Sequence, residues 1–136
     1  MNTMNTMNTI GRILGEATKV RPPTEDELTD PYQAYWYAVR VLKGRFREGE
    51  PALATDPRAA YNYSMHINGP FSEGEPAIAT DPQWASLYAK WVLNRRFPEA
   101  EVAIATDPEW AKEYLKAFPE AKLEWIMNGW LDWLDS

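Results

Sequence analysis

The stretch "EGEPAIATDP", at Glu73–Pro82, occurs in two further near-copies along the chain. The upstream copy reads "EGEPALATDP" (Glu48–Pro57), and the downstream copy reads "EAEVAIATDP" (Glu99–Pro108). Three copies of a ten-residue phrase in 136 residues indicate a structural repeat. The dipeptide Asp-Pro marks its period. The steps between successive copies are 56−30 = 26, 81−56 = 25 and 107−81 = 26 residues, from the positions Asp30, Asp56, Asp81 and Asp107.

Each Asp-Pro predicts the start of a long helix. The Asp carboxylate can accept hydrogen bonds from the free backbone N–H groups of the first turn. Proline at the first helical position loses only an N–H that has no partner there. Apolar residues then follow at helical spacing, as in Ala34, Tyr37, Ala38, Val41 and Leu42. Gly44 and Gly69 predict the ends of the first two helices, whereas Arg95 at this point predicts a different turn in the third repeat.

The repeated phrase itself predicts a short helix in front of each long one. Glu50-Pro51 and Glu75-Pro76 are typical of a helix start, and Ala residues favour one or two helical turns. The alternation Ala-Ile-Ala leaves a strand as the alternative. Proline disfavours the helical conformation for the Asp before it, so the short and the long helix remain separate. The recurring glutamates are interpreted as helix-capping groups rather than acid–base pairs.

A helix pair of about 26 residues cannot bury its apolar face alone, so neighbouring pairs must stack. We therefore expect an all-α fold, a short α-solenoid of about four helix-pair repeats over residues 30–136, starting near 30, 56, 81 and 107. The end of the chain, "KLEWIMNGWLDWLDS", predicts a C-terminal capping helix. Its expected buried stripe comprises Leu123, Ile126, Met127, Trp130, Leu131 and Leu134.

Residues 1–29 are expected to form a separate N-terminal segment. Its "MNTMNTMNT" triplets have neither charge nor an apolar pattern and predict disorder. Ile10–Ala17 predicts a short helix, and "TEDEL" (Thr24–Leu28) is typical of a capping-box helix start or of an acidic linker.

Composition limits the possible functions. The chain has no Cys, which excludes disulfides and thiolate chemistry. Its formal net charge of −6 disfavours a general nucleic-acid binder. No apolar run reaches the roughly 20 residues of a membrane span, so we expect a cytoplasmic protein without a membrane partner. His66 is the only histidine and is interpreted as a surface residue. Without a phosphate loop or a nucleophile motif, we expect no enzyme, no catalytic or metal-binding residues and no cofactor.

The pattern "KGRF.EGEPAIATDP.WA..YA" resembles a family of tandem-repeat proteins of tailed bacteriophages, whose units read like "KGRWPEAEPYIMKDPEWAYRYAK". The resemblance covers about residues 30–128. It implies an all-helical repeat and a phage-encoded protein of the host cytoplasm. No activity or functional residue is common to the family, so none is transferred to this chain.

Aromatic residues give the only positive indication of function. The recurring Tyr37, Tyr63, Tyr88 and Tyr114 are expected in the core. Aromatic residues that do not recur are typical of interface anchors or of a thin core. The predicted partner-binding residues are Tyr35, Trp36, Arg40, Trp91, Trp125, Trp130 and Trp133.

The leading hypothesis is a protein-binding module that inhibits or redirects a host protein, for example a defence component. One alternative is a self-associating assembly protein that forms a homo-oligomer through its C-terminal helix. The others are a nucleic-acid binder acting through the Arg40–Arg47 region and an acidic DNA mimic.

Overall fold

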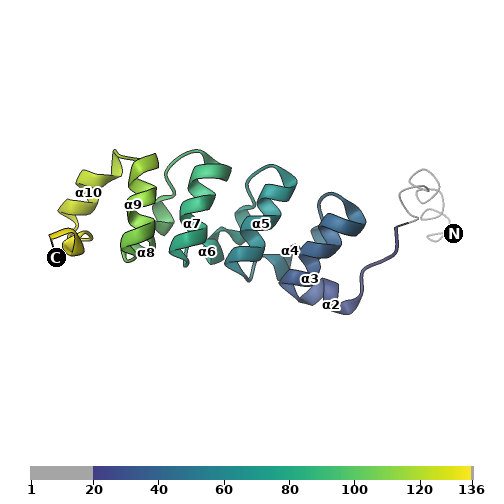
Figure 1. Cartoon of the computed structure of the whole chain (residues 1–136). Helices are drawn as coiled ribbons and strands as arrows, with labels where there is room; N and C mark the ends of the chain where they lie inside the picture. Colours follow the sequence, from purple (N-terminus) through teal and green to yellow (C-terminus); the bar gives the residue numbers. More distant parts are fainter. Residues whose placement is uncertain (1–19, 136) are drawn as a thin grey trace.

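The computed structural model describes residues 20–135, and within that range the chain is an elongated stack of helices without strands (Figure 1). Each of the long helices packs against the next. They are α3 (Pro31–Trp36) continued by η2 (Tyr37–Leu42), α5 (Pro57–Ile67), α7 (Pro82–Tyr88) continued by η5 (Ala89–Leu93), and α9 (Pro108–Ala117). The predicted all-α repeat fold is confirmed.

A 3-10 turn and a short helix precede each of the last three long helices. The turns are η3 (Arg47–Gly49), η4 (Ser72–Gly74) and η6 (Pro98–Ala100). The short helices are α4 (Glu50–Leu53), α6 (Glu75–Ile78) and α8 (Glu101–Ala105). The repeated phrase is therefore helical, as predicted, and the strand alternative is wrong. The predicted caps are also confirmed, because the side chains of Asp30, Asp56, Asp81 and Asp107 each accept a backbone N–H of the first turn.

A local change of helix type accounts for the unequal repeat lengths. The second repeat, with a period of 25 residues, has an α-helix throughout α5. The first and third repeats contain one more residue, and their helices finish as the π-helices η2 and η5. A π-helix closes its hydrogen bonds between residues five apart, so its wider turn contains the additional residue. The residues that follow thereby keep the same place in every repeat.

Deletion of Lys90 is expected to convert η5 to an α-helix and to leave the protein folded, because the third repeat then has the length of the second. Deletion of Met65 from α5 should destabilise by more than about 3 kcal/mol, since it displaces the buried Phe71 and leaves a void. Urea denaturation followed by circular dichroism measures both changes. Equal losses in the two deletion variants would contradict this role of the π-helices.

The predicted glycine stops are wrong by one residue. The left-handed residues that end the three helices are Lys43, Asn68 and Asn94, with φ of 57°, 60° and 56°. Asn tolerates this conformation better than most residues with a side chain. Gly44 and Gly69 come one position later and have no positive φ. The third turn is therefore like the first two, although Arg95 stands where the others have glycine.

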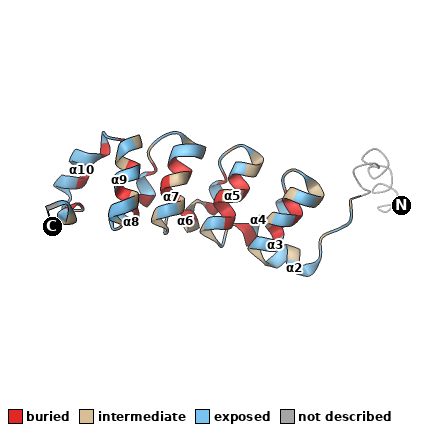
Figure 2. Ribbon diagram, viewed as in Figure 1, coloured by how far each residue is buried: buried red, intermediate tan, exposed pale blue. Residues whose placement is uncertain are grey.

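Buried positions recur from one helix to the next along the stack (Figure 2). Most of the core residues at these positions are alanine, tyrosine and phenylalanine. Each tyrosine ring packs against the phenylalanine that follows it, with centroids 4.7 Å apart for Tyr37 and Phe46 and 5.0 Å apart for Tyr63 and Phe71. The small alanines let the backbones of neighbouring helices approach. The predicted core role of the recurring tyrosines is confirmed.

A buried hydrogen-bond ladder joins each repeat to the next. The hydroxyl of Tyr63 donates to Glu50 at 2.6 Å and accepts the backbone N–H of Phe46 at 2.8 Å. Tyr88 makes the same two bonds to Glu75 and Phe71, and Tyr114 makes them to Glu101 and Phe97. The three glutamates were expected to be helix caps, but none of them caps its helix. They recur because each one accepts the tyrosine hydroxyl of the following repeat.

Arginines support the first and third of these glutamates. Arg45 contacts Glu50 at 2.7 Å, and Arg96 contacts Glu101 at 2.6 Å. Burial of the Glu101 carboxylate opposes its charged form, but hydrogen bonds from Arg96, Tyr114 and Trp125 together outweigh this, so the pKa of Glu101 lies below its usual value. In the second repeat Pro70 replaces the arginine. The ladder is therefore strongest near the C-terminal end.

The ladder tyrosines are expected to ionise only as the protein unfolds. Burial, followed by the hydrogen bond to Glu50, raises the pKa of Tyr63 to about 12. The same two causes raise the pKa values of Tyr88 and Tyr114. Their contribution to stability is therefore complete below about pH 10, the unfolded pKa, and is lost as the pH rises through the folded values. Tyrosinate absorbance and circular dichroism, followed together against pH, test this. Ionisation of all tyrosines near pH 10 in a fully helical protein would contradict it.

The described N-terminal residues join the stack. Thr24 and Glu27 form the predicted capping box of α2 (Glu25–Thr29), which packs against α3 and α4. The Tyr37 hydroxyl, which has no preceding ladder glutamate, donates to the backbone oxygen of Arg21. The expectations for the "MNT" triplets and for a short helix at Ile10–Ala17 lie outside the described residues.

At the C-terminal end, α10 (Ala121–Met127) and η7 (Asp132–Asp135) cover the last repeat. The buried residues here are Ala121, Trp125 and Leu131. The predicted buried stripe of the capping helix is therefore largely wrong, because Leu123, Ile126 and Met127 are exposed. Trp125 stacks on Tyr114 at 5.3 Å and donates to Glu101. These contacts turn the Trp125 side of α10 inward and leave the other apolar side facing solvent.

Candidate protein-binding surface

Trp36 and Arg40 form a cation–aromatic pair on the first long helix. The indole of Trp36 is 50% exposed, and the guanidinium carbon of Arg40 lies 4.6 Å from its ring centroid. Tyr35 supports the indole edge-on, with centroids 5.5 Å apart. An exposed indole held by a neighbouring ring and a cation loses little side-chain freedom on binding, which is a property of interface anchors.

Trp91 forms a second anchor in the third repeat. It is 55% exposed, and the Lys90 ammonium nitrogen lies 5.0 Å from its ring centroid. A hollow of about 220 Å³ separates it from the end of α5, where Met65 and Asn68 line the opposite wall. A smaller hollow of about 40 Å³ lies on its α9 side, next to Trp110. Side chains of a partner can therefore contact this indole on both sides.

Trp36 and Trp91 occupy nearby positions in their repeats, six and ten residues after the capping Asp. A difference of four residues is about one helical turn, so both indoles lie on the same side of the long helices. One repeat, containing α5, lies between them. With adjacent helices about 10 Å apart, the two anchors are about 20 Å apart. We call this side of the stack, with Trp36, Arg40, Lys90 and Trp91, the outer face.

His66 and Tyr35 lie between these anchors but contribute less surface. His66 is half-buried rather than on the open surface as expected, and its Nε2 donates to the Gly44 oxygen at 3.0 Å. Its ring lies edge-on to Tyr35 at 6.5 Å. The histidine thereby links the first two repeats, and Tyr35 packs partly into the core.

The predicted C-terminal tryptophans do not join the outer face. Trp125 is fully buried, so it belongs to the core and is not available to a partner. Trp130 is half-buried, with its ring 6.2 Å from that of Trp125. Trp133 is half-buried and donates its indole N–H to the Ala105 oxygen at 2.9 Å. The sequence could not separate these roles, because all three residues stand in one apolar stretch.

The basic Arg40–Arg47 region does not form a single cationic patch. Arg45 is held by Glu50 of the ladder, and Arg40 lies over Trp36. Lys43 and Arg47 are exposed, with Glu48 next in the chain.

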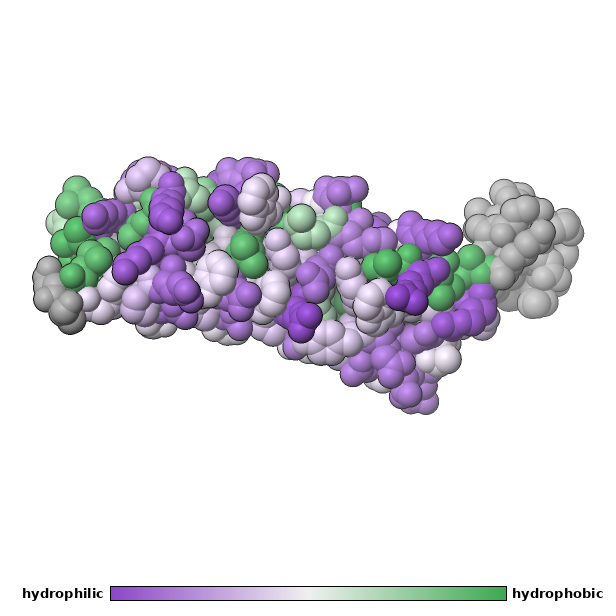
Figure 3. Space-filling model, viewed as in Figure 1, coloured by the Kyte–Doolittle hydropathy of each residue, from purple (hydrophilic) through white to green (hydrophobic). Residues whose placement is uncertain are grey.

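A second apolar surface, not predicted from the sequence, covers the C-terminal end. Leu123 and Met127 of α10 are 68% and 77% exposed, and Ile126 lies between them. In Figure 3 hydrophobic side chains gather at this end and again near α3 and η2, while polar side chains cover most of the remaining view. The sequence shows these apolar residues at helical spacing, but the spacing does not indicate that they face solvent.

Among residues 20–135, no cluster of three or more His, Asp or Glu side chains is arranged to hold a metal ion. Within the same range, each helix is too short or too polar to cross a bilayer.

Comparison with known proteins gives no match: no family model, no curated protein and no solved structure is significantly similar to this chain.

Proposed function

We propose that this protein is a non-enzymatic module that binds another protein through the outer face and thereby inhibits or redirects it. The observation that supports this most directly is the pair of half-exposed tryptophans, Trp36 and Trp91, each with a cation over its ring. Tryptophan and arginine are the residues most enriched among binding hot spots. A stacked repeat also offers an extended, rigid surface, which lowers the entropy cost of binding.

The resemblance to phage repeat proteins directs this proposal toward a host protein. A phage-encoded module would act in the cytoplasm of a bacterial host, for example on a defence component. The ladder holds the anchors on a rigid scaffold, since each repeat is hydrogen-bonded to the next. Two anchors about 20 Å apart suit a partner with a flat or gently curved surface better than one with a narrow cleft.

The test compares the parent protein with the double variant Trp36→Ala and Trp91→Ala. Both are used as baits in nuclease-treated bacterial lysate, and a retained protein is then purified and titrated directly. Loss of the two anchors is expected to weaken its binding at least 100-fold, since a hot-spot residue contributes 2 kcal/mol or more.

The matched control is the double variant Leu123→Ala and Met127→Ala, which removes two exposed apolar side chains from α10. It should bind the same partner as tightly as the parent. Unchanged affinity of the tryptophan variant, with both proteins equally helical, would refute binding through the outer face.

Self-association is the second candidate, supported by the exposed apolar side of α10. A homo-oligomer through this helix predicts a concentration-dependent mass in light scattering. The Leu123→Ala and Met127→Ala variant would then be monomeric. A parent protein that remains monomeric at high concentration would exclude this candidate.

A further inference from the structure

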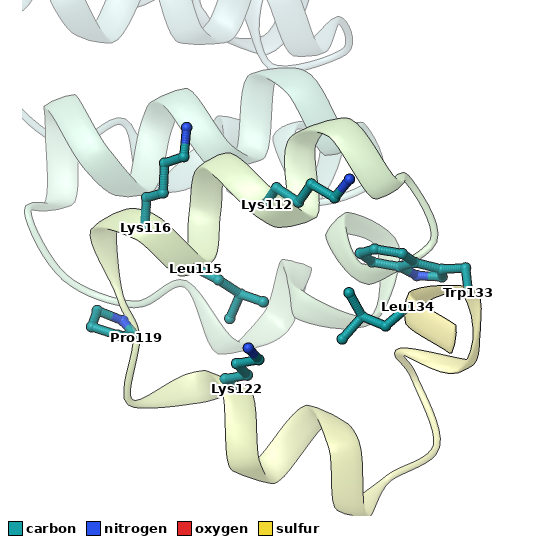
Figure 4. A pocket seen from close by; sticks show the side chains of 7 residues that line it. All are labelled: Lys112, Leu115, Lys116, Pro119, Lys122, Trp133 and Leu134. Atoms are coloured by element: carbon teal, nitrogen blue, oxygen red, sulfur yellow. The ribbon is translucent and has the colours of Figure 1, made fainter. Parts of the chain in front are cut away.

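A groove lies between α9, the start of α10 and η7, at the C-terminal end of the stack (Figure 4). Its volume is about 410 Å³, within the usual range of ligand-binding pockets. Leu115 and Leu134 face each other across it, with Pro119 at one end and Trp133 at the other. The floor is therefore apolar, and it is formed by residues from three separate elements.

Three lysines complete the lining of this groove. Lys112 and Lys116 come from α9, one helical turn apart, and Lys122 reaches from α10 into the space between the helices. The Lys112 ammonium nitrogen lies 5.9 Å from the Trp133 ring centroid. Lys116 also contacts the exposed Glu113 at 3.1 Å. Every charged residue that lines the groove is a lysine.

This charge pattern is opposite to that of the whole protein. The chain has a formal net charge of −6, yet the charged residues lining this apolar floor are lysines. Lys122 extends into the space, whereas the Lys116 side chain points away from Leu115 in Figure 4, with its ammonium against Glu113. A local positive potential attracts acidic ligands to that place, while the negative charge of the remaining surface repels them elsewhere. An apolar floor with a cationic rim is complementary to an amphipathic segment with apolar residues on one side and carboxylates on the other.

We propose that this groove docks an acidic amphipathic segment of a partner protein. A bulky apolar side chain of that segment lies between Leu115 and Leu134, and its Asp or Glu side chains contact Lys112, Lys116 and Lys122. Helix-in-groove docking uses apolar anchors three or four residues apart. The groove is short and accommodates about one turn of a docked helix. The inference does not depend on the outer face, whose anchors belong to the first and third repeats.

The probe for this site is a synthetic helical peptide with Leu and Phe on one side and Asp and Glu on the other. The reference peptide is identical except that Lys replaces every Asp and Glu. Anisotropy of the labelled peptides against the full-length protein gives the affinities. We expect the acidic peptide to bind at least tenfold more tightly than the basic one, and its affinity to fall as salt is added.

The decisive variant replaces Lys112, Lys116 and Lys122 by Glu. The matched control replaces the exposed Arg47, Arg58 and Arg95 by Glu, so both variants change the net charge by the same amount. Reversing the charge of the three groove lysines is expected to weaken binding of the acidic peptide by about tenfold or more, because several exposed charge pairs are lost together. The control should bind nearly as the parent does.

Equal losses in the two triple variants would overturn the proposal, because binding would then follow net charge alone. Equal affinity for the acidic and basic peptides would also overturn it. Competition against the bound labelled peptide is a further test. The proposal would be overturned if unlabelled decanoate, or self-association of this chain, displaced the labelled peptide at a lower concentration than the unlabelled acidic peptide does. The variant Leu134→Glu, at an exposed position, is a further check that leaves the lysines intact. This variant should also weaken binding of the acidic peptide. Unchanged binding would contradict the proposal that Leu134 contacts the apolar side chain of the segment.

Discussion

Replacing Glu101 by Ala is expected to lower the free energy of unfolding by about 3 kcal/mol or more, the largest loss among the three ladder glutamates. The Glu101 carboxylate is buried and accepts hydrogen bonds from Arg96, Tyr114 and Trp125. Its removal leaves a tyrosine hydroxyl and an indole N–H buried without this acceptor. The half-buried guanidinium keeps only the exposed Glu124. Urea denaturation followed by circular dichroism measures the loss.

Glu75→Ala is the matched control for this prediction. Glu75 occupies the same place in the preceding repeat, but it accepts from Tyr88 without an arginine beside it. The expected loss is about 1–2 kcal/mol, the cost of one unsatisfied buried group. Equal losses at the two positions would show that the arginine and the indole contribute nothing.

The role of Glu101 also predicts a pH dependence. Because its pKa is lower in the folded protein than in the unfolded chain, its contribution is complete above the unfolded pKa of about 4.3 and is lost as the pH falls through the folded value. The stability difference between the parent and Glu101→Gln should therefore narrow below about pH 4. A difference that stays constant down to the acid-unfolding midpoint would contradict this.

Trp125→Ala is expected to destabilise by about 3–5 kcal/mol, the usual cost of truncating a large buried aromatic residue. The indole is fully buried, stacks on Tyr114 and donates to Glu101. The variant therefore loses packing at the end of the stack and one hydrogen bond of the ladder. Thermal and urea unfolding of the purified variant test the prediction.

Trp91→Ala provides the comparison, because it removes the same side chain from a half-exposed position. Its effect on stability should be below about 1 kcal/mol, as for most surface substitutions. If both tryptophan variants lost similar stability, the division between core and binding surface drawn from the structure would be wrong.

Local signals explain which parts of the fold could be predicted. The Asp-Pro pairs predicted all four long helices, because a cap and a first-turn proline act within a few residues. The helix ends are less local, because the left-handed position falls on Lys43 and Asn68 and not on the glycines that follow them. The unequal period of 26 and 25 residues was visible in the sequence. Its consequence, a π-helix in the longer repeats, is visible only in the structure.

The candidate binding residues divide according to their neighbours. Trp36, Arg40 and Trp91 are available on the outer face. Trp125 is not, although it differs little from them in sequence context. Sequence periodicity identifies the two sides of α10, but it does not say which side faces the preceding repeat.

The sequence by itself determined the period, the helical character and the stacking of this protein, because caps, prolines and apolar spacing act over a few residues and then recur. Only the tertiary structure decided which glutamate meets which tyrosine, since those partners are 13 residues apart and belong to successive repeats. It also decided the orientation of α10, because a single indole that reaches Glu101 fixes which of two apolar sides is buried.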